Sequence, residues 1–196
     1  MKANINMKQN NDITSRIKED LFRYVGNNPT GIVSKVRLYG WQYLKTLRKA
    51  NYYYENNRFL YLLYGYFLYK KSLKYGFQIS PQAKIGRGLY LGHFGTIIVG
   101  NEVEIGDNVN LNPNVIIGRE NRGVREGSPK LGNRVWVGTG SVIVGNIKIG
   151  SNVLIAPNIY VNFDVPDNSI VIGNPAVIKA NALATEKYIC NIVVRS

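Results

Sequence analysis

Aliphatic residues recur at every sixth position in the second half of the chain, and this spacing constrains the fold more than any other feature. The uninterrupted run consists of Leu131, Val137, Ile143, Ile149, Ile155 and Val161. Small or β-branched residues form a second column four positions later, as at Val135, Val153 and Val165. One six-residue unit is too short to bury its apolar side chain alone, so we expect stacked units that share a continuous core.

The same spacing begins earlier, with two irregularities. It starts at Ile85 and Leu91, slips by two residues, and continues from Val99 to Ile117. Fourteen residues then separate Ile117 from Leu131, so one step carries an eight-residue insertion. We interpret each unit as a short strand and a turn, with three units closing a triangular coil and coils stacked roughly 4.8 Å apart. The insertion must then leave the prism as a loop.

Residues 11–75 have helical spacing instead. Asn27 to Gly31 is a predicted break, the next helix is predicted from Ile32 to about Tyr54, and a third segment covers Phe59 to Tyr69. The third segment has eleven uncharged residues, whereas a bilayer span needs roughly 20 apolar residues. With its basic flanks, segment 58–74 is predicted either to pack against its own domain or a neighbouring subunit, or to rest on a membrane surface.

The net charge of +13 is concentrated in the first part of the chain. Residues 1–80 contain fourteen Lys or Arg and four acids. Such an excess is typical of a solvated basic face or of a surface that attracts polyanions. The aromatic residues between positions 39 and 69 have helix-core spacing and no nucleic-acid-binding module is recognisable, so no nucleic-acid partner is predicted.

The single Cys190 and the single His93 leave too few ligands for a disulfide framework or a structural zinc site, so no metal is predicted. The polar start, MKANINMKQNNDITSR, has no apolar secretory stretch and is expected to form a frayed tail. Together these features predict a cytoplasmic protein, with the inner membrane surface as an alternative location.

The repeat resembles that of the hexapeptide-repeat acyltransferases, in which an aliphatic residue, a small residue and a later small or β-branched residue recur every six positions. The ending Asp164-Val165-Pro166 and Gly173-Asn174-Pro175-Ala176 is similar to the last coil and exit of that superfamily. The resemblance implies a mainly β fold: a left-handed parallel β-helix over residues 77–180, after an N-terminal α-helical region at 1–76 and before a C-terminal tail at 181–196. It also implies a homotrimer with active sites between subunits.

The segment from Ile79 to Ile97 resembles the serine acetyltransferase branch, particularly its members that are similar to capsule and surface-polysaccharide O-acetyltransferases. The resemblance places His93 at the catalytic histidine, where the repeat slips. It implies direct acetyl transfer from acetyl-CoA to a hydroxyl, with an imidazole accepting the hydroxyl proton and later returning it to the thiolate. No acyl-enzyme is expected, because Cys190 lies outside the repeats and the chain has no Gly-x-Ser-x-Gly elbow.

Two features depart from the serine acetyltransferase pattern. Gly92 precedes His93 where that branch has Asp, and Gln78 occupies the position of the carboxylate that orients the ring. Pro113 stands near the position of the second histidine. Gln78 is therefore the predicted hydrogen-bond partner of His93, and a carbohydrate of a capsule or surface glycan is the predicted acceptor. L-serine O-acetylation and a non-catalytic scaffold that binds a polyanion are the alternatives.

The remaining candidates follow from the resemblance and from residue size. Small or exposed corner residues could let the thin arm of coenzyme A approach, although any coil of this kind needs small corners. The coenzyme A candidates are Gly138, Thr139, Gly140, Gly145 and Asn146, with Lys148 and Lys179 as phosphate partners. The substrate-binding candidates are Asn112, Asn114, Arg119 and Arg122. The two arginines belong to the inserted loop, which either helps to close the site or hold coenzyme A phosphates, or is a solvated surface loop.

Overall fold

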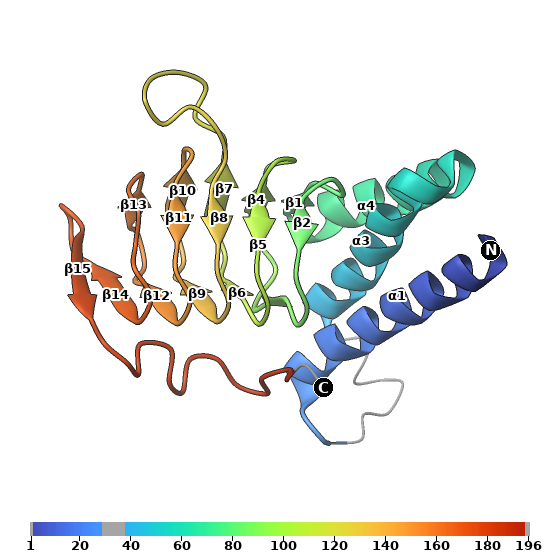
Figure 1. The fold of residues 1–196 in the computed structure, drawn as a ribbon, viewed down its shortest axis with the longest axis horizontal. Coiled ribbons are helices and arrows are strands. Elements are labelled where there is room, and N and C mark those ends of the chain that lie inside the picture. Colours follow the sequence, from blue (N-terminus) through green and yellow to red (C-terminus); the bar gives the residue numbers. More distant parts are fainter. Residues whose placement is uncertain (1, 29–37, 195–196) are drawn as a thin grey trace.

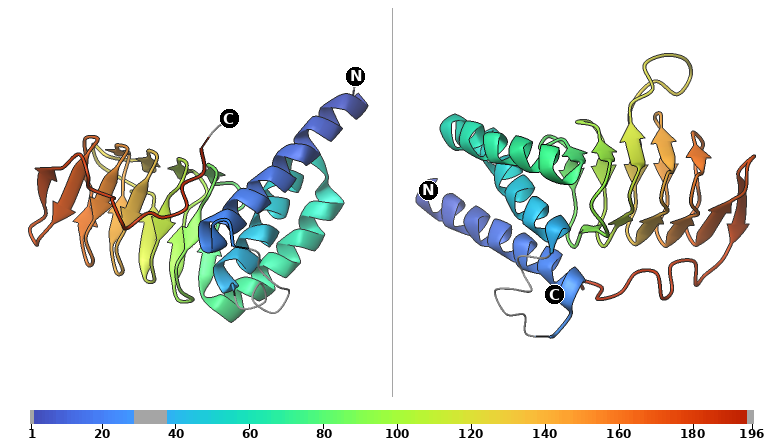
Figure 2. Two further views of the ribbon diagram at one scale, coloured as in Figure 1. Left: turned by 90° about the horizontal axis from the view of Figure 1, so that it is seen from below. Right: turned by 180° about the vertical axis from the view of Figure 1, so that it is seen from behind.

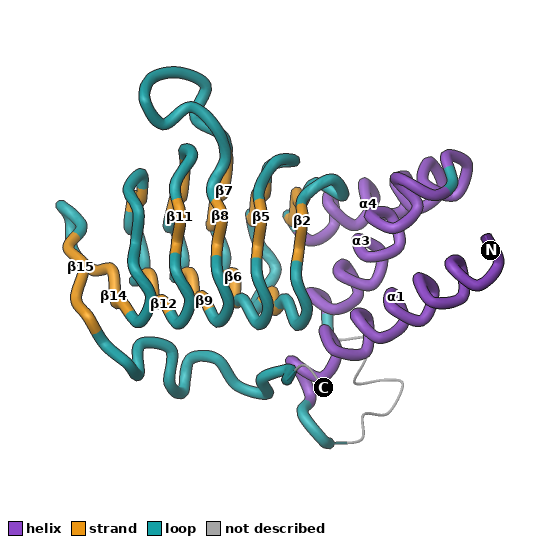
Figure 3. Tube along the Cα trace, viewed as in Figure 1, coloured by secondary structure: helices purple, strands orange, loops and turns teal. Residues whose placement is uncertain are grey.

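The computed structural model describes residues 2–28 and 38–194, with side chains from Ile13 onward. Two parts lie end to end in Figure 1, a group of helices and a prism of short strands. The prism has three parallel sheets, named here faces A, B and C. Figure 3 shows that each strand is brief and that turns make up the corners between the faces.

The strands repeat in the order A, B, C along the chain. Face A consists of β1 (Phe77–Ile79), β4 (Ile97–Val99), β7 (Val115–Gly118), β10 (Val142–Val144) and β13 (Tyr160–Val161). Face B consists of β2 (Lys84–Ile85), β5 (Glu104–Ile105), β8 (Lys130–Leu131) and β11 (Lys148–Ile149). Face C consists of β3 (Tyr90–Leu91), β6 (Asn110–Leu111), β9 (Val135–Val137), β12 (Val153–Ile155), β14 (Ser169–Ile172) and the antiparallel β15 (Val177–Ala180).

The two predicted columns form the core of this prism. Every residue of the uninterrupted run is at most 5% exposed, and Val135, Val153 and Val165 of the second column are at most 2% exposed. The fourteen-residue gap separates β7 from β8 and leaves the prism as a loop, which projects from the top of the prism in Figure 1. The parallel β-helix expected from the repeat is therefore confirmed.

Three helices cover the N-terminal end of the prism: α1 (Lys2–Val25), α3 (Tyr39–Asn56) and α4 (Arg58–Tyr75). α1 begins at Lys2, so the segment expected to fray is helical. The predicted helix from Ile32 is described only from Tyr39, because residues 29–37 lie outside the described part, as does most of the predicted break. α4 continues to Tyr75 and ends at Gly76, whose φ of 82° favours glycine. No helix in the described part is long and apolar enough to cross a membrane.

α3 seals the end of the core with its apolar face. Its buried side chains include Tyr43, Leu44 and Leu47, and the Tyr43 ring lies 5.1 Å from that of Phe77 in β1, measured between ring centroids. Without α3, the inward side chains of the first coil would be exposed at the open end of the prism. The free energy that their burial contributes to folding would then be lost.

A buried ion pair fixes α1 and α3 to the first coil. Arg48 of α3 and Asp20 of α1 are 4% and 0% exposed, and they meet at 2.9 Å. Arg48 also donates hydrogen bonds to the carbonyl oxygens of Ile85 and Gly86, and Asp20 accepts one from the backbone N–H of Leu89. The charges are thus both paired and hydrogen-bonded, which is the arrangement that makes a buried pair tolerable.

The C-terminal segment after β15 returns along face C to the helices, as both views of Figure 2 show. The ring of Tyr188 packs 5.0 Å from that of Trp136 of face C, and Asn108 exchanges hydrogen bonds with the backbone of Val193. At its far end, the carbonyl of Cys190 accepts a hydrogen bond from Arg23 of α1. Face C is therefore covered by the chain's own tail.

Replacing Asp20 by Asn tests the importance of the helix–coil ion pair. The change removes the Asp20 carboxylate that contacts the buried Arg48, so we expect the free energy of unfolding to fall by about 3 kcal/mol in denaturant titration. Glu104→Gln is the control, because Glu104 pairs with Lys84 and Lys130 on the solvent side, and an exposed pair contributes less than about 1 kcal/mol. Equal losses in both variants would contradict the assigned role.

Candidate functional site

The three faces of the prism differ in their outward side chains and in what covers them. Face B carries the outward ladder of Lys84, Glu104 and Lys130, joined by ion pairs, and face C lies under the tail. Face A is apolar and uncovered over most of its length. Its outward side chains align in register and are Ile98, Ile116, Val142 and Tyr160. Ile116 and Tyr160 are 36% and 55% exposed, which is unusual for large apolar side chains in such a row.

His93 lies at the edge of face A, in the turn that joins β3 of face C to β4. Six positions separate Leu91 from Ile97, whereas four separate their register partners Leu111 and Val115 in the next coil. Two extra residues therefore bulge outward at this turn, and His93 is exposed there. The turn is fixed by the Gly95 N–H, which donates to the carbonyl of Tyr75, and by the Asn114 N–H, which donates to that of Thr96.

Several other candidates share this edge, which we call the C/A edge. The next two turns along it contain Asn112 with Asn114 and then Gly138, Thr139 and Gly140. These turns are bonded to one another: the Thr139 hydroxyl donates to the carbonyl of Pro113 at 2.6 Å, and the Gly140 N–H donates to the same oxygen. Stacking thus places in one row residues that are 45 positions apart in the sequence.

The C/A edge ends in a cavity of about 310 Å³ at the C-terminal coils. It is lined by Asn158, Tyr160, Phe163 and residues 173–176. In the sequence, the motif at residues 173–176 predicts only the exit from the last coil. The aromatic lining at Tyr160 and Phe163 was not predicted from the sequence. It depends on which side chains of a strand and the following turn point outward, and no motif marks these two residues.

Gln78 points outward from β1 on face A and lines a different cavity, of about 410 Å³, between α4 and face A. No hydrogen bond joins it to His93 among residues 38–194. The predicted orienting contact thus stays a prediction.

The other candidates lie away from the C/A edge of the same chain. Gly145 and Asn146 occupy the opposite edge of face A, where the inserted loop folds onto them and the Asn146 N–H donates to the carbonyl of Arg125. Arg119 is held within the loop region by Glu102 and Glu126. Arg122 is exposed on the loop, Lys148 lies on face B, and Lys179 lies on β15.

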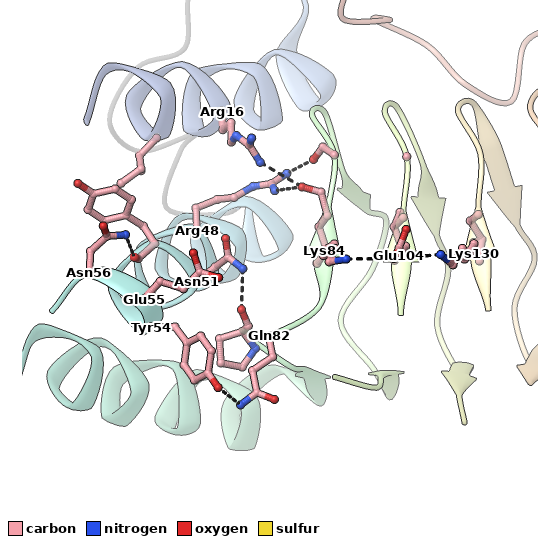
Figure 4. A pocket seen from close by; sticks show the side chains of 18 residues that line it. Arg16, Arg48, Asn51, Tyr54, Glu55, Asn56, Gln82, Lys84, Glu104 and Lys130 are labelled. Carbon is pink, nitrogen blue, oxygen red and sulfur yellow. Dashed lines mark hydrogen bonds and ion pairs between the residues drawn. The ribbon is translucent and has the colours of Figure 1, made fainter. Parts of the chain in front are cut away.

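Another cavity, of about 660 Å³, lies between α1, α3 and face B (Figure 4). Its polar side chains bind one another: Lys84 and Lys130 contact Glu104, and the Gln82 amide donates to the hydroxyl of Tyr54. It contains no His or Cys, and it lies on a face that does not include the His93 turn. Within the described residues, no group of three His, Cys, Asp or Glu side chains could hold a metal ion.

This architecture is similar to that of known proteins. A model of the bacterial transferase hexapeptide family, with six repeats, matches residues 128–160. The crystal structure of serine acetyltransferase from Neisseria gonorrhoeae has a TM-score of 0.75 with 27% sequence identity, and the match covers 90% of this chain and 68% of that one. Residues 128–160 therefore match the hexapeptide-repeat transferases, and the fold of the chain is similar to that of a serine acetyltransferase. The left-handed parallel β-helix with N-terminal helices is accordingly its fold class.

Two further proteins are similar to this chain. Serine acetyltransferase from Brucella abortus strain S19, solved in complex with coenzyme A, has a TM-score of 0.75 and 28% identity, over 89% of this chain and 70% of that one. Serine acetyltransferase from Helicobacter pylori is 40% identical over 101 residues, which are 52% of this chain and 59% of the relative. The chain spans less than two thirds of the length of the curated relatives it matches. These relatives support the superfamily but not its capsule and polysaccharide branch.

Gly95→Ala tests whether the bulge positions His93. Gly95 has a φ of 140°, and an added Cβ would lie 3.3 Å from Cβ of Pro113. We expect a loss of about 1–3 kcal/mol in unfolding free energy, because a side chain is strained in this conformation. The chain has one His, so its imidazole signals in the NMR spectrum should shift as well.

Gly118→Ala is the matched control, since Gly118 has open space around the position of a Cβ. It should leave both the stability and the imidazole signals of the protein unchanged. An unshifted imidazole in Gly95→Ala would show that the bulge does not depend on this glycine.

Proposed function

We propose that this chain is an O-acetyltransferase that uses acetyl-CoA and has His93 as its general base. The observation that carries the proposal is the position of the chain's single imidazole, on a two-residue bulge at the exposed edge of an open apolar face. A side chain that only filled the core would not need the bulge. The names of the relatives agree with an acetyl-transfer reaction.

The imidazole supplies what the reaction requires. A hydroxyl is protonated at neutral pH, so it becomes a competent nucleophile only if its proton is accepted as the oxygen attacks the thioester carbonyl. The new C–O bond forms, the C–S bond breaks, and the proton held on His93 passes to the departing thiolate. Cys190 takes no part, because it lies on the tail that covers face C.

Acetyl-CoA is proposed to lie along the C/A edge, with its thioester at His93 and its nucleotide end toward the cavity at residues 173–176. The turns between them, from Asn112 to Gly140, are linked by backbone hydrogen bonds and provide few bulky side chains. Coenzyme A has a long, narrow arm, so a row of small turns suits it better than a closed pocket. Gly145, Asn146, Lys148 and Lys179 would contact it only from a neighbouring subunit.

L-serine is the first acceptor to consider, because the relatives compared above are called serine acetyltransferases. A carbohydrate hydroxyl is the second, and a specific observation favours it. An added Cβ at Gly92 would have only ordinary contacts, 3.4 Å from Asn112 and Tyr90. Packing therefore does not impose glycine there, and the missing carboxylate is a change in the chemistry of the site.

A trimer is proposed from the unequal faces. The ladder on face B is charged and face C is covered, so the apolar row on face A is the surface left for a neighbour. The two edges of face A differ. His93 lies at one edge, and the inserted loop with Arg119 and Arg122 lies at the other. A three-fold arrangement brings unlike edges together, so each site would gain the loop of its neighbour.

The enzymatic proposal is tested by comparing wild type with His93→Ala, using labelled acetyl-CoA and a panel of serine, sugars and nucleotide sugars. We expect a loss of about 10²–10⁴-fold in kcat, because that is the usual contribution of a general base. The acceptor with the highest kcat/KM decides between serine and a carbohydrate. Equal transfer by both proteins would remove His93 from the mechanism, and absence of saturable acetyl-CoA binding would favour a scaffold.

The proposed trimer is tested by Ile116→Glu, which places a charge in the middle of the apolar row. We expect wild type to have about three times the 22.0 kDa chain mass in light scattering, and the variant to dissociate, because a buried unpaired charge is strongly unfavourable. Leu183→Glu is the control, as Leu183 is 64% exposed on the tail. A trimer that survives Ile116→Glu would mean that face A is not the interface.

A further inference from the structure

α4 is apolar on both of its sides, although only one side is covered. Its inner side packs on α3 and β1, with Leu68 buried. Its outer side exposes seven large apolar side chains, each 42–76% exposed: Phe59, Leu62, Leu63, Tyr66, Phe67, Tyr69 and Leu73. Five of them follow spacings of three and four residues and so form one strip. A helix that is apolar all round is normally buried, so this strip requires a cover.

A small cationic pocket adjoins the strip. It lies between α3 and α4, has a volume of about 170 Å³, and is lined by Lys45, Thr46, Lys49, Tyr64, Phe67 and Lys71. The Lys71 ammonium donates to the Thr46 hydroxyl and to the carbonyl of Gln42, and the Lys49 ammonium donates to the hydroxyl of Tyr64. Among the residues that the structure describes, three lysines and no acidic side chain line the pocket.

Lys71 is the lysine of this pocket that is affected by burial and by its charged neighbours. Burial, together with the positive charges of Lys45, Lys49 and Lys74, lowers the pKa of Lys71 to about 8. An anion in the pocket would relieve this repulsion. Phe67 lines the pocket, and its ring lies 5.8 Å from that of Tyr66 in the strip, so a ligand with an anionic head and an apolar body could contact the two together.

We propose that α4 docks this protein on an anionic phospholipid membrane, with the strip in the boundary between headgroups and acyl chains and a lipid phosphate in the α3–α4 lysine pocket. Exposed aromatic and aliphatic side chains beside cationic residues suit the boundary between headgroups and acyl chains, where the apolar groups are buried and the charges meet lipid phosphates. Arg58, Lys70 and Lys74 at the margins of the strip provide further attraction to the headgroups. The tyrosine hydroxyls suit the same boundary, since they are polar tips on apolar rings.

A second copy of the chain is a poorer cover for the strip. α4 contains no acid, and Glu55 is the only one in α3. Two copies meeting strip to strip would bring Arg58, Lys70 and Lys74 of each close together, with the lysine pockets beside them. An anionic lipid surface matches this charge instead of opposing it.

The proposal is tested by flotation of the full chain with vesicles of phosphatidylglycerol and phosphatidylcholine, and with vesicles of phosphatidylcholine alone. We expect binding to the anionic vesicles, weaker with added salt. Lys45→Gln with Lys49→Gln should weaken binding about fivefold per lysine, roughly 30-fold in total. Leu62→Gln with Leu73→Gln should reduce binding to the level seen with phosphatidylcholine.

Matched controls remove the same groups elsewhere. Lys18→Gln with Lys84→Gln takes two exposed lysines from α1 and face B, and Val124→Gln with Leu183→Gln takes two exposed apolar side chains from the loop and the tail. Both should bind like wild type, as should His93→Ala, so vesicle binding is separable from acetyl transfer. Circular dichroism and the melting temperature establish that each variant folds.

Three results would overturn the proposal. One is equal binding to neutral and anionic vesicles. Another is calorimetric binding of inorganic phosphate, lost in Lys45→Gln with Lys49→Gln, without vesicle binding, which would assign the pocket to a free anion. The third is a wild-type protein that binds no vesicles but has a larger mass in solution than the variant Leu62→Gln with Leu73→Gln. This result would assign the strip to contacts between copies.

Discussion

The whole molecule depends on the burial of one aliphatic side chain in every six residues. A two- or three-residue strand contributes little by itself, and each coil is stable only because the coils above and below cover its inward side chains. The requirement holds at the ends as well as in the middle. α3 supplies the cover at the first coil, and the antiparallel β15 borders the last strand of face C.

Packing of the core constrains only the inward-pointing residues. The outward-pointing residues are free to differ, and these residues give each face its own surface and role. Charged residues make face B a solvent face, the tail covers face C, and the apolar row on face A remains. The same freedom applies to turns. The turn at His93 can carry two extra residues, and the turn after Gly118 can carry a loop, because neither changes the register of Ile97 or Leu131.

The sequence predicts the β-helix well because its signal is local and periodic. Each aliphatic residue of the six-residue spacing shows its inward position by spacing alone, and the two-residue slip shows that the turn at His93 departs from the regular repeat. Which candidates lie together could not be predicted in the same way, since it depends on which corner each turn occupies. Thr139 and Gly145 are six residues apart and look equivalent in the repeat, yet they lie on opposite edges of face A.

The contacts of the helices with the prism and the tail could not be predicted from residue spacing either. Arg23 is 4% exposed, and its guanidinium donates to carbonyl oxygens of Gly88 and Cys190 and to the side chain of Asn110. Burial lowers its pKa. In the sequence it is one of many basic residues in a basic segment. In the structure it joins α1, the prism and the tail, which are separated by up to 167 positions.

These junctions connect the proposed membrane helix to the proposed site. α4 ends at Tyr75, whose carbonyl accepts the Gly95 N–H of the His93 turn, and the ring of Tyr39 packs 5.6 Å from Tyr75 and 5.9 Å from Phe94. The helix and the turn are thus in direct contact, with no flexible linker between them. An α4 resting on a lipid surface would hold the C/A edge at a fixed height above it, so an acceptor presented at that surface would meet His93 without a search through bulk solution.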